Sequence, residues 1–473
     1  MDFSIAQIAK ACGGQLFLNT VSEDFQVSGV VLDSRLVTEG AVFVATVGER
    51  VDGHSFIPQV CEKGACLVVC ERSPEALTEQ VNVPEGCNYL VVENSFQALK
   101  DIAESYRHTL SIPIVGITGS VGKTSTKEFV AGVLAEKYNV LKTEGNYNNE
   151  VGVPLTLLRI RKEHTAAVVE MGISDFGEMH RLSKMVRPNI CLITNIGQCH
   201  LENLKTRDGI LKAKTEIFDF MAPDGAVVLN GEDDKLSTLE RVKDNTIVPY
   251  FFGLGHNEKE SVYAENIVSK GLWGSEAVIQ MRFDDTQAVK VNVPLPGHHM
   301  VINSAAAATV GRLLGLDSAQ IAAGISKIQP TSGRGRLVRL SNATLIDDCY
   351  NANPVSMKAA IDLLMMADNR TVAILGDMFE LGEDSDKMHG EVGAYAAKSG
   401  VNEMIFVGEN ALHMYEAAAR ETTSQKLSYY ADRAEFIKAL PKMSKLKENC
   451  TVLLKASHGM HFEEALSILE KEN

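Results

Sequence analysis

The sequence lacks the features that mark secreted, membrane-spanning and nucleic-acid-binding proteins. The N-terminal stretch MDFSIAQIAKACGG has no basic segment followed by an apolar one, so no signal peptide is expected. No apolar run approaches the roughly 20 residues of a membrane-spanning helix. Positive charge is scarce, with 46 Lys and Arg against 61 Asp and Glu, and the net charge of −15 opposes nonspecific binding to nucleic acid or an anionic membrane. We therefore expect a cytoplasmic protein with neither kind of partner.

The nine cysteines indicate neither a disulfide framework nor a zinc site. Cys61, Cys66 and Cys70 come closest to a cluster, but their spacing is not that of zinc ligands. Reduced structural thiols are the expectation. The length of 473 residues favours about three domains, and a hydrophobic content of 45% supports several cores.

The most informative motif is GITGSVGKTS, from Gly116 to Ser125. An apolar run before it predicts a buried strand, and the amphipathic run from Thr124 to Tyr138 predicts a helix after it. The full pattern G-x-x-x-x-G-K-[ST] requires glycine where Ile117 stands, but the strand and helix supply the context of a phosphate loop. Such a loop binds nucleotide phosphates through backbone N–H groups and the helix N-terminus, with the lysine on the outer phosphates and the hydroxyl of Thr124 on Mg²⁺. The alternative is a glycine turn with a surface lysine.

Three segments follow one another along the chain: 1–95, 96–328 and 329–473. The first has short strands and turns, which predict a small mixed α/β domain. The second alternates strands with helices after the phosphate loop, which predicts a central parallel-sheet ATPase domain. Its residues 262–267, 276–283 and 288–293 resemble inserted antiparallel strands. The third alternates again, which predicts a doubly wound, Rossmann-like domain.

Several polar residues follow predicted strands and would share the ligand-binding edge of a parallel sheet. Glu170 and His200 stand near Lys123 by this argument, and Asp348, Asp377 and Lys455 end strands of the third segment. Plainer interpretations stay open, because His200 suits a helix cap or a core position, Lys214 a solvated helix face, and 347–354 an N-cap cluster. The residues alone indicate an enzyme that uses ATP.

The chain resembles the Mur ligase family along essentially its whole length. The resemblance is carried by DSR at 33–35, DGH at 52–54, GSVGKTS, TEGNYNNEVGVPLTLL at 143–158, EMG at 170–172, TNIGQCH at 194–200, AKTEIF at 213–218, IDDCYNANP at 346–354 and LGDMFELG at 375–382. The Asn-rich stretch, YNANP and LGDMFELG favour the members that add a dipeptide. The resemblance implies three domains, for a UDP-sugar, for ATP and, at the C-terminus, a Rossmann-like ligase domain. It also implies a monomer with UDP-N-acetylmuramoyl-tripeptide, D-Ala-D-Ala and ATP as substrates and Mg²⁺ as cofactor.

Residue by residue, the resemblance assigns roles to the following positions. The catalytic group is Lys123, Glu170, His200 and Lys214, the last as a carbamylated lysine, and the metal ligands are Thr124, Glu170, His200 and Lys214. ATP would meet Gly119, Ser120, Val121, Gly122, Lys123, Thr124, Ser125, Asn303, Arg336, Asp348 and Asn351. The UDP-sugar would meet Ser34, Arg35, Asn146, Asn148 and Asn149.

Two positions depart from the family pattern. Met300 stands where His-Asn-x-x-Asn has its first amide, and His458 stands where Lys-Gly-Ser-Arg has an arginine that contacts an anionic substrate. The reaction implied passes through an acyl phosphate, which the dipeptide amine attacks. The alternatives are a ligase for another amino acid, a folylpolyglutamate synthase, or a nucleotide-dependent regulatory protein with a degenerate site.

Overall fold

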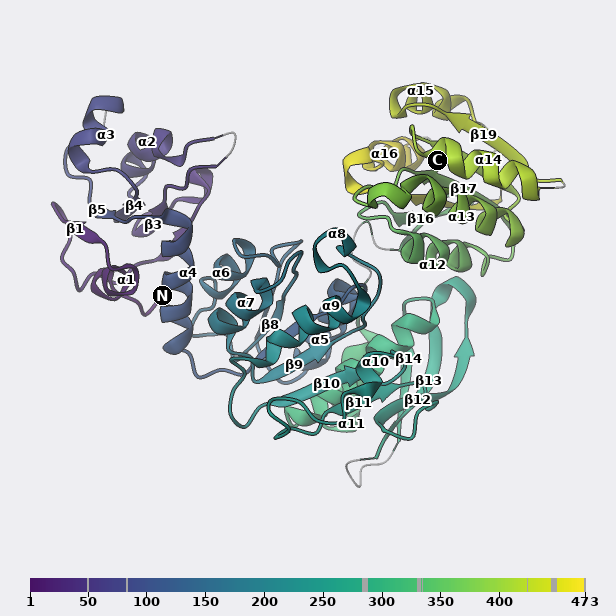
Figure 1. Cartoon of the computed structure of the whole chain (residues 1–473), viewed down its shortest axis with the longest axis horizontal. Coiled ribbons are helices and arrows are strands. Elements are labelled where there is room, and N and C mark those ends of the chain that lie inside the picture. The colour runs from purple at the N-terminus through teal and green to yellow at the C-terminus, as the bar shows by residue number, and fades with distance from the viewer. Residues whose placement is uncertain are drawn as a thin grey trace. The chain divides into compact units, whose positions relative to one another are not determined.

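The structure, a computed structural model, describes residues 1–48, 51–81, 84–282, 288–329, 333, 335–422, 424–443 and 449–471 (Figure 1). These residues form two compact units. The first comprises Met1–Tyr263, Gln280–Gln287 and Asn303–Gly324, and the second Ala264–Ile279, Ala288–Ile302 and Ile325–Asn473. Among the described residues no helix is long and apolar enough to cross a membrane.

The N-terminal part is built on a five-stranded sheet covered on both faces. The strand order is β1(Gln15–Phe17), β5(Tyr89–Val91), β4(Leu67–Cys70), β3(Ala41–Val44), β2(Gly29–Val31), and the short helices are α1(Ile5–Cys12), α2(Ile57–Glu62) and α3(Pro74–Gln80). Only the β1–β5 pair is antiparallel. In β3, Val42 and Val44 join one core while Phe43 joins another, as strand alternation requires. The predicted small mixed α/β fold is confirmed.

Helix α4(Ser95–His108) packs between this sheet and the central one within the first unit. Its residues Leu99, Ile102 and Tyr106 recur at helical spacing and belong to one core that draws from both sheets. The Tyr106 hydroxyl donates to the carbonyl of Ile160 at 2.7 Å. The predicted domain boundaries at 95 and 328 stay predictions.

The central sheet has nine strands. Their order is β14(Val289–Val293), β13(Ser275–Met281), β12(Glu260–Ser269), β11(Tyr250–Gly253), β10(Ala226–Asn230), β9(Ile190–Ile193), β6(Ile114–Thr118), β8(Ala166–Glu170), β7(Val140–Lys142). The helices are α5(Lys123–Leu134), α6(Gly152–Leu157), α7(Glu178–Val186), α8(Leu201–Leu204), α9(Arg207–Thr215), α10(His298–Leu313) and α11(Ser318–Ser326). Parallel pairing from β7 to β12 confirms the predicted parallel sheet.

The three strands expected as an antiparallel insert differ from that expectation. β12 pairs parallel with β11 and so extends the main sheet, whereas β13 and β14 pair antiparallel. Periodicity reports which residues are buried but not the direction of the neighbouring strand, which explains the error. Residue 283, the predicted end of the second strand, lies outside the described residues.

The C-terminal part has a six-stranded sheet within the second unit. The order is β15(Arg336–Arg339), β16(Ala343–Asp348), β20(Cys450–Lys455), β17(Arg370–Gly376), β18(Glu403–Val407), β19(Lys426–Tyr430), with α12(Pro354–Leu364), α13(Ser385–Lys398), α14(Ala411–Glu421), α15(Arg433–Ala439) and α16(Glu463–Lys471). All pairs but β15–β16 are parallel. Neighbouring residues of each central strand enter cores on opposite faces, which confirms the Rossmann-like architecture.

The prediction that all cysteines are reduced was wrong for one pair. Cys61 and Cys87 form a disulfide with their Cα atoms 6.0 Å apart, and the other seven cysteines lie outside any disulfide. The two residues are 26 positions apart, so only the tertiary fold brings them together.

A buried carboxyl group lies where β10 and β11 end. The Glu260 side chain is fully buried, and a Cβ at Gly231 or Gly253 would come within 2.7 or 2.4 Å of it. Its Oε2 accepts from the Gly255 N–H at 2.6 Å, while Oε1 has no hydrogen-bond partner in the described part of the chain. Burial, reinforced by the Glu232 carboxylate, raises the pKa of Glu260.

We expect Glu260→Gln to remove a pH dependence of stability. Because the pKa is raised in the folded state, protonated Glu260 favours folding at low pH, and this contribution is lost as pH rises through the folded pKa. Relative to wild type, the variant should gain about 1–3 kcal/mol between pH 5 and pH 8, the scale of an unsatisfied buried polar group. Urea unfolding at both pH values measures this, with exposed Glu240→Gln as control. Parallel pH profiles of the variant and wild type would contradict the prediction.

Candidate active site

The phosphate-loop motif forms the turn between β6 and α5. Gly119 has φ 148°, and a Cβ there would lie 1.9 Å from Thr194 Oγ1, so only glycine fits. Gly122 has φ 82° and precedes the helix. Ile117 is buried within β6, which explains why the sequence needs no glycine there: the turn begins two residues later.

The loop is clamped by residues that sequence reasoning missed. The Asn195 side chain accepts from the Val121 N–H at 2.9 Å and donates to the Val121 carbonyl at 2.9 Å. Thr194 Oγ1 donates to the same carbonyl at 2.7 Å, and Ser120 Oγ accepts from Gly197 N–H at 2.9 Å. The sequence signal for this clamp is TNIG at 194–197, directly after the strand. From the sequence alone, it is recognised only as part of the family motif.

Lys123 occupies the mouth of the loop. Its Nζ donates to the Gly119 carbonyl at 2.8 Å and lies 3.5 Å from the Ser120 carbonyl. The ammonium therefore lies among the backbone groups that would surround a phosphate. Ser125 follows in the first turn of α5.

Oxygen ligands converge beside the loop. The Thr124 hydroxyl donates to Glu170 Oε2 at 2.9 Å, and Asn148 Nδ2 donates to Glu170 Oε1 at 2.8 Å. Glu170 ends β8 and is 1% exposed. A hydroxyl, a carboxylate and a neighbouring amide are the hard donors that Mg²⁺ prefers, so this set fits the implied cofactor.

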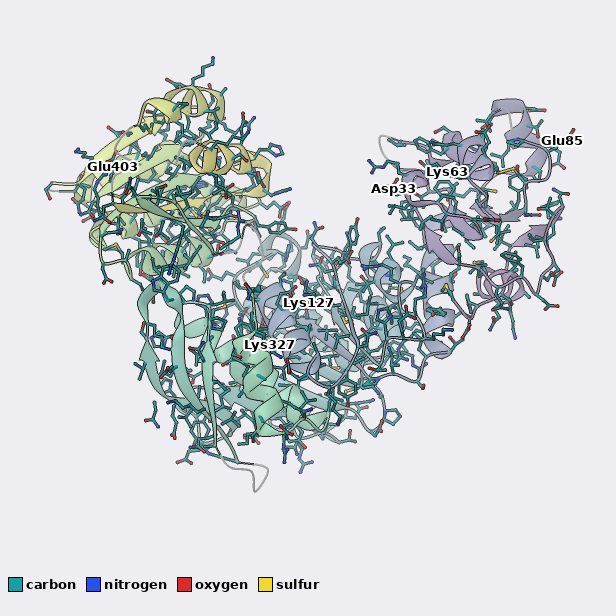
Figure 2. All side chains as sticks on the ribbon, turned by 180° about the vertical axis from the view of Figure 1, so that it is seen from behind. Asp33, Lys63, Glu85, Lys127, Lys327 and Glu403 are labelled. Atoms are coloured by element: carbon teal, nitrogen blue, oxygen red, sulfur yellow. A yellow bond between two sulfur atoms is a disulfide. The ribbon has the colours of Figure 1, made fainter. Side chains whose placement is uncertain are left out.

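Lys127, which sequence reasoning also missed, balances part of this charge (Figure 2). Its buried Nζ donates to the Thr143 carbonyl at 2.7 Å and lies 3.9 Å from Glu170 Oε2. The Thr143 hydroxyl accepts from the Glu170 N–H at 2.9 Å. Lys127 lies one helical turn after Lys123 in α5. From this spacing alone, one expects only that both lysines lie on the same face of the helix.

Lys214 is not the solvated helix lysine of the plainer interpretation. It lies in α9 and is 1% exposed. Burial and the nearby Lys123 ammonium lower the pKa of Lys214 to about 7. A substantial fraction of the amine is therefore neutral and nucleophilic near neutral pH.

His200 is exposed, has φ 51° and stands at the start of α8. Among the described residues no three His, Cys, Asp or Glu side chains form a metal-binding group, so the role of His200 as a metal ligand stays a prediction.

The remaining candidates of the first unit lie in helix caps and turns. Asn149 Oδ1 accepts from the Val151 and Gly152 N–H groups at the turn that leads into α6, while Asn146 is exposed. In α10, Asn303 Oδ1 accepts from the Thr126 hydroxyl at 3.0 Å, which ties this helix to α5.

The DSR motif forms a short 3-10 helix from Ser34 to Leu36. Asp33 caps it and holds the Arg35 guanidinium at 2.6 Å, and these hydrogen bonds lower the pKa of Asp33 to about 2. Lys63 donates to the Ser34 carbonyl at 2.8 Å, near Asp33 (Figure 2). Whether Ser34 and Arg35 meet a UDP-sugar stays a prediction.

The candidates of the second unit form internal ion pairs. Arg336 Nε lies 3.3 Å from the buried Asp347 carboxylate. Lys455 Nζ lies 2.6 Å from Asp348 and donates to the Asn351 carbonyl at 2.9 Å. Their contacts with ATP stay predictions.

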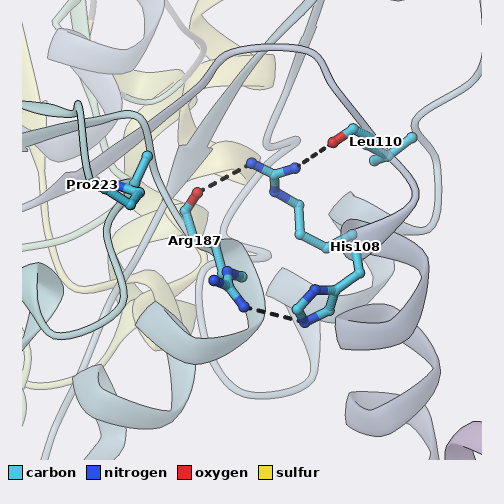
Figure 3. Close-up of a pocket in the computed structure, with 6 residues that line it drawn as sticks. His108, Leu110, Arg187 and Pro223 are labelled. Atoms are coloured by element: carbon cyan, nitrogen blue, oxygen red, sulfur yellow. Dashed lines mark hydrogen bonds between the residues drawn. The ribbon is translucent and has the colours of Figure 1, made fainter.

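A separate pocket in the first unit has none of these residues. It is lined by Arg107, His108, Leu110, Arg187, Ala222 and Pro223 (Figure 3). The Arg107 guanidinium donates to the carbonyls of Val186, Leu110 and Arg187 at 2.8, 2.9 and 3.1 Å. It therefore satisfies backbone carbonyls that follow α4 and end α7, which is a structural role.

Three domain models of one protein family match successive stretches of the chain. Residues 26–107 match the Mur ligase family catalytic domain, 117–311 the Mur ligase middle domain, and 333–458 the glutamate ligase domain of Mur ligases.

Individual relatives match over nearly the full length. The UDP-N-acetylmuramoyl-tripeptide–D-alanyl-D-alanine ligases of Bacillus subtilis and Escherichia coli are 33% and 31% identical, covering 98% and 100% of this chain and 98% and 99% of theirs. The crystal structure of MurF from Acinetobacter baumannii is 29% identical with a TM-score of 0.86, covering 99% of each chain. The MurF ligase of Thermotoga maritima in complex with ADP is 29% identical with a TM-score of 0.77, covering 95% of this chain and 99% of that one.

Proposed function

The chain belongs to the Mur ligase family, and we propose that it joins D-Ala-D-Ala to UDP-N-acetylmuramoyl-tripeptide at the expense of ATP, in peptidoglycan precursor synthesis. The observation that carries the proposal is the phosphate loop, in which Thr124 is hydrogen-bonded to Glu170. The chain is similar along nearly its whole length to UDP-N-acetylmuramoyl-tripeptide–D-alanyl-D-alanine ligases. Cytoplasmic location, a monomeric state and the absence of nucleic-acid and membrane partners belong to the same proposal.

ATP is activated by positioning and charge. Residues 119–125 hold its phosphates, and Lys123 neutralises charge on the transferring phosphoryl group. Thr124, Glu170, His200 and a carbamylated Lys214 would hold Mg²⁺, which would supply positive charge to stabilise the phosphates. The further residues proposed to contact ATP are Asn303, Arg336, Asp348 and Asn351.

The reaction then proceeds in two steps. The terminal carboxylate of the tripeptide attacks the γ-phosphorus, which gives an acyl phosphate and ADP. The free amine of D-Ala-D-Ala attacks the acyl carbon, loses a proton, and phosphate leaves as the amide forms. Activation is needed because a bare carboxylate is a poor electrophile, and Ser34, Arg35 and the 146–149 turn would hold the UDP-sugar.

One assay separates this proposal from its alternatives. Phosphate release from ATP should require both the UDP-sugar tripeptide and D-Ala-D-Ala. Release with a single amino acid or with a folate substrate in place of these would instead favour another ligase, and nucleotide binding without turnover would favour a regulatory protein. Tripeptides ending in diaminopimelate and in lysine should be compared in the same panel.

Met300 provides a test of the nucleotide site. With methionine in place of an amide, we expect Asn303, shape and stacking to hold the adenine, so discrimination among purine triphosphates is weakened. A polar base contact is worth about 1–3 kcal/mol, so Met300→Asn should raise the preference for ATP over GTP about tenfold. The ratio of kcat/KM for the two nucleotides measures this, with the KM for dipeptide as control. Equal ratios in the variant and wild type would make Met300 a packing residue only.

A further inference from the structure

The loop after β17 runs from Asp377 to Gly382. Hydrogen bonds from its first three residues hold it in place. Asp377 Oδ1 accepts from the Ala411 N–H at 2.7 Å, and the Met378 N–H donates to buried His389 at 3.0 Å. The Phe379 N–H donates to Ser457 Oγ at 2.9 Å. The loop is therefore tied to α14, to α13 and to the segment after β20.

The next residue, Glu380, is held in an unfavourable backbone conformation. Its φ is 62°, in the left-handed region that costs a side-chain-bearing residue of this kind about 1 kcal/mol or more. Such outliers persist where surrounding structure holds them, and they cluster at ligand sites. Its side chain is exposed and has no hydrogen bond or ion pair with any residue in the described part of the chain.

Two other carboxylates at this edge of the sheet are already engaged. Asp348 is paired with Lys455, and Asp377 caps α14. Glu380 is an exposed carboxylate in the loop that Asp377 begins, at the edge where parallel sheets bind ligands.

Phe379 adds an apolar surface next to this carboxylate. Phe379 is 43% exposed, and a Cβ at Gly459 would come within 3.0 Å of Phe379 Cε2, so the ring lies against the backbone of the segment after β20. An exposed phenyl ring followed by an unpaired carboxylate suits a small ligand with a methyl group beside an ammonium.

We propose that Glu380 and Phe379 form the subsite for the amino-terminal residue of the dipeptide substrate, an inference that rests on the proposed function. D-Ala-D-Ala carries an α-amino group, largely protonated at neutral pH, with a methyl on the adjacent carbon. Glu380 accepts hydrogen bonds from the amino group, and Phe379 packs on the methyl group. Because bonds from residues 377–379 already hold the loop backbone, binding has mainly the two side chains to order.

Kinetics of Glu380→Gln test the carboxylate. Because a charge-assisted hydrogen bond is lost, the KM for D-Ala-D-Ala should rise about tenfold or more, while the KM values for ATP and tripeptide stay within about twofold. Glu416→Gln, an exposed change on α14 in the same unit, is the control and should leave all three constants unchanged. An unchanged dipeptide KM in an active Glu380→Gln enzyme would overturn the inference.

Two further variants separate binding from folding. Glu380→Gly should raise the thermal midpoint, because glycine tolerates the left-handed backbone, and yet raise the dipeptide KM as Gln does. Phe379→Ala should reduce the preference for D-Ala-D-Ala over glycyl-D-Ala several-fold. A stabilised Gly variant with wild-type dipeptide KM, or unchanged preference in Phe379→Ala, counts against the subsite. A wild-type enzyme without dipeptide-dependent phosphate release would sink the proposed function itself, which is a distinguishable result.

Discussion

Lys123→Ala is expected to abolish nearly all ATP turnover and ligation. The ammonium lies among the loop carbonyls, 2.8 Å from that of Gly119, and it is the loop's only point charge for a transferring phosphoryl group. Loss of one such stabilising contact costs about 10²-fold or more in kcat. Phosphate release under saturating substrates measures the effect.

The controls for this variant separate charge from folding. Lys162→Ala, an exposed lysine in the same unit, should keep full activity. Circular dichroism and thermal melting should show that the Lys123 variant is folded, since the clamp by Asn195 and Thr194 does not involve the lysine side chain. More than about a tenth of wild-type turnover in folded protein would refute the role of Lys123.

The phosphate loop was predictable because its determinants are local. A buried strand, a glycine turn and an amphipathic helix follow one another within about 25 residues, and each has its own sequence signal. Ile117 appeared as a flaw only because the motif was compared letter by letter. In the structure it is an ordinary strand residue.

The rest of the site depends on contacts that no local pattern reports. Asn195 clamps Val121 from 74 residues away, and Lys127 approaches Glu170 only after α5 packs on β8. A lysine on a helix looks the same in a sequence whether it is solvated or buried, and Lys127 and Lys214 are both buried here.

The predictions of strand direction and of cysteine pairing were wrong for the same reason. Buried and partly exposed residues alternate along β12 as they would in a hairpin strand. The alternation does not determine which strand β12 pairs with, and it pairs parallel with β11. The Cys61–Cys87 bond likewise reflects a distance set by the folded N-terminal sheet. Both depend on tertiary structure, which composition and spacing do not encode directly.

Lys214→Ala tests the most specific chemical hypothesis about the site, that this lysine carries a carbamate. The neutral amine attacks CO₂, an N–C bond forms, one proton is released, and the neutral amine becomes a carbamate anion. Burial, together with repulsion between two adjacent cations, lowers the pKa of Lys214 beside Lys123 to about 7. The neutral amine that the reaction needs is therefore present near neutral pH. The product carboxylate would attract Lys123 and Mg²⁺ where the ammonium repels them.

We expect Lys214→Ala to lose about 10²-fold or more of its activity, the scale of removing a preorganised charge contact. Short carboxylic acids such as acetate or propionate should restore part of it by occupying the vacated space, whereas alcohols of equal size should not. Lys212→Ala, an exposed lysine on the same helix, is the matched control and should be active without any addition. A carbamate carbon detected by ¹³C NMR after growth with labelled bicarbonate, absent from Lys214→Ala, would identify the group directly. Full activity of the variant, or an unmodified amine in an active nucleotide-bound crystal, would refute the carbamate, because a buried cation beside Lys123 could not then serve as the metal ligand.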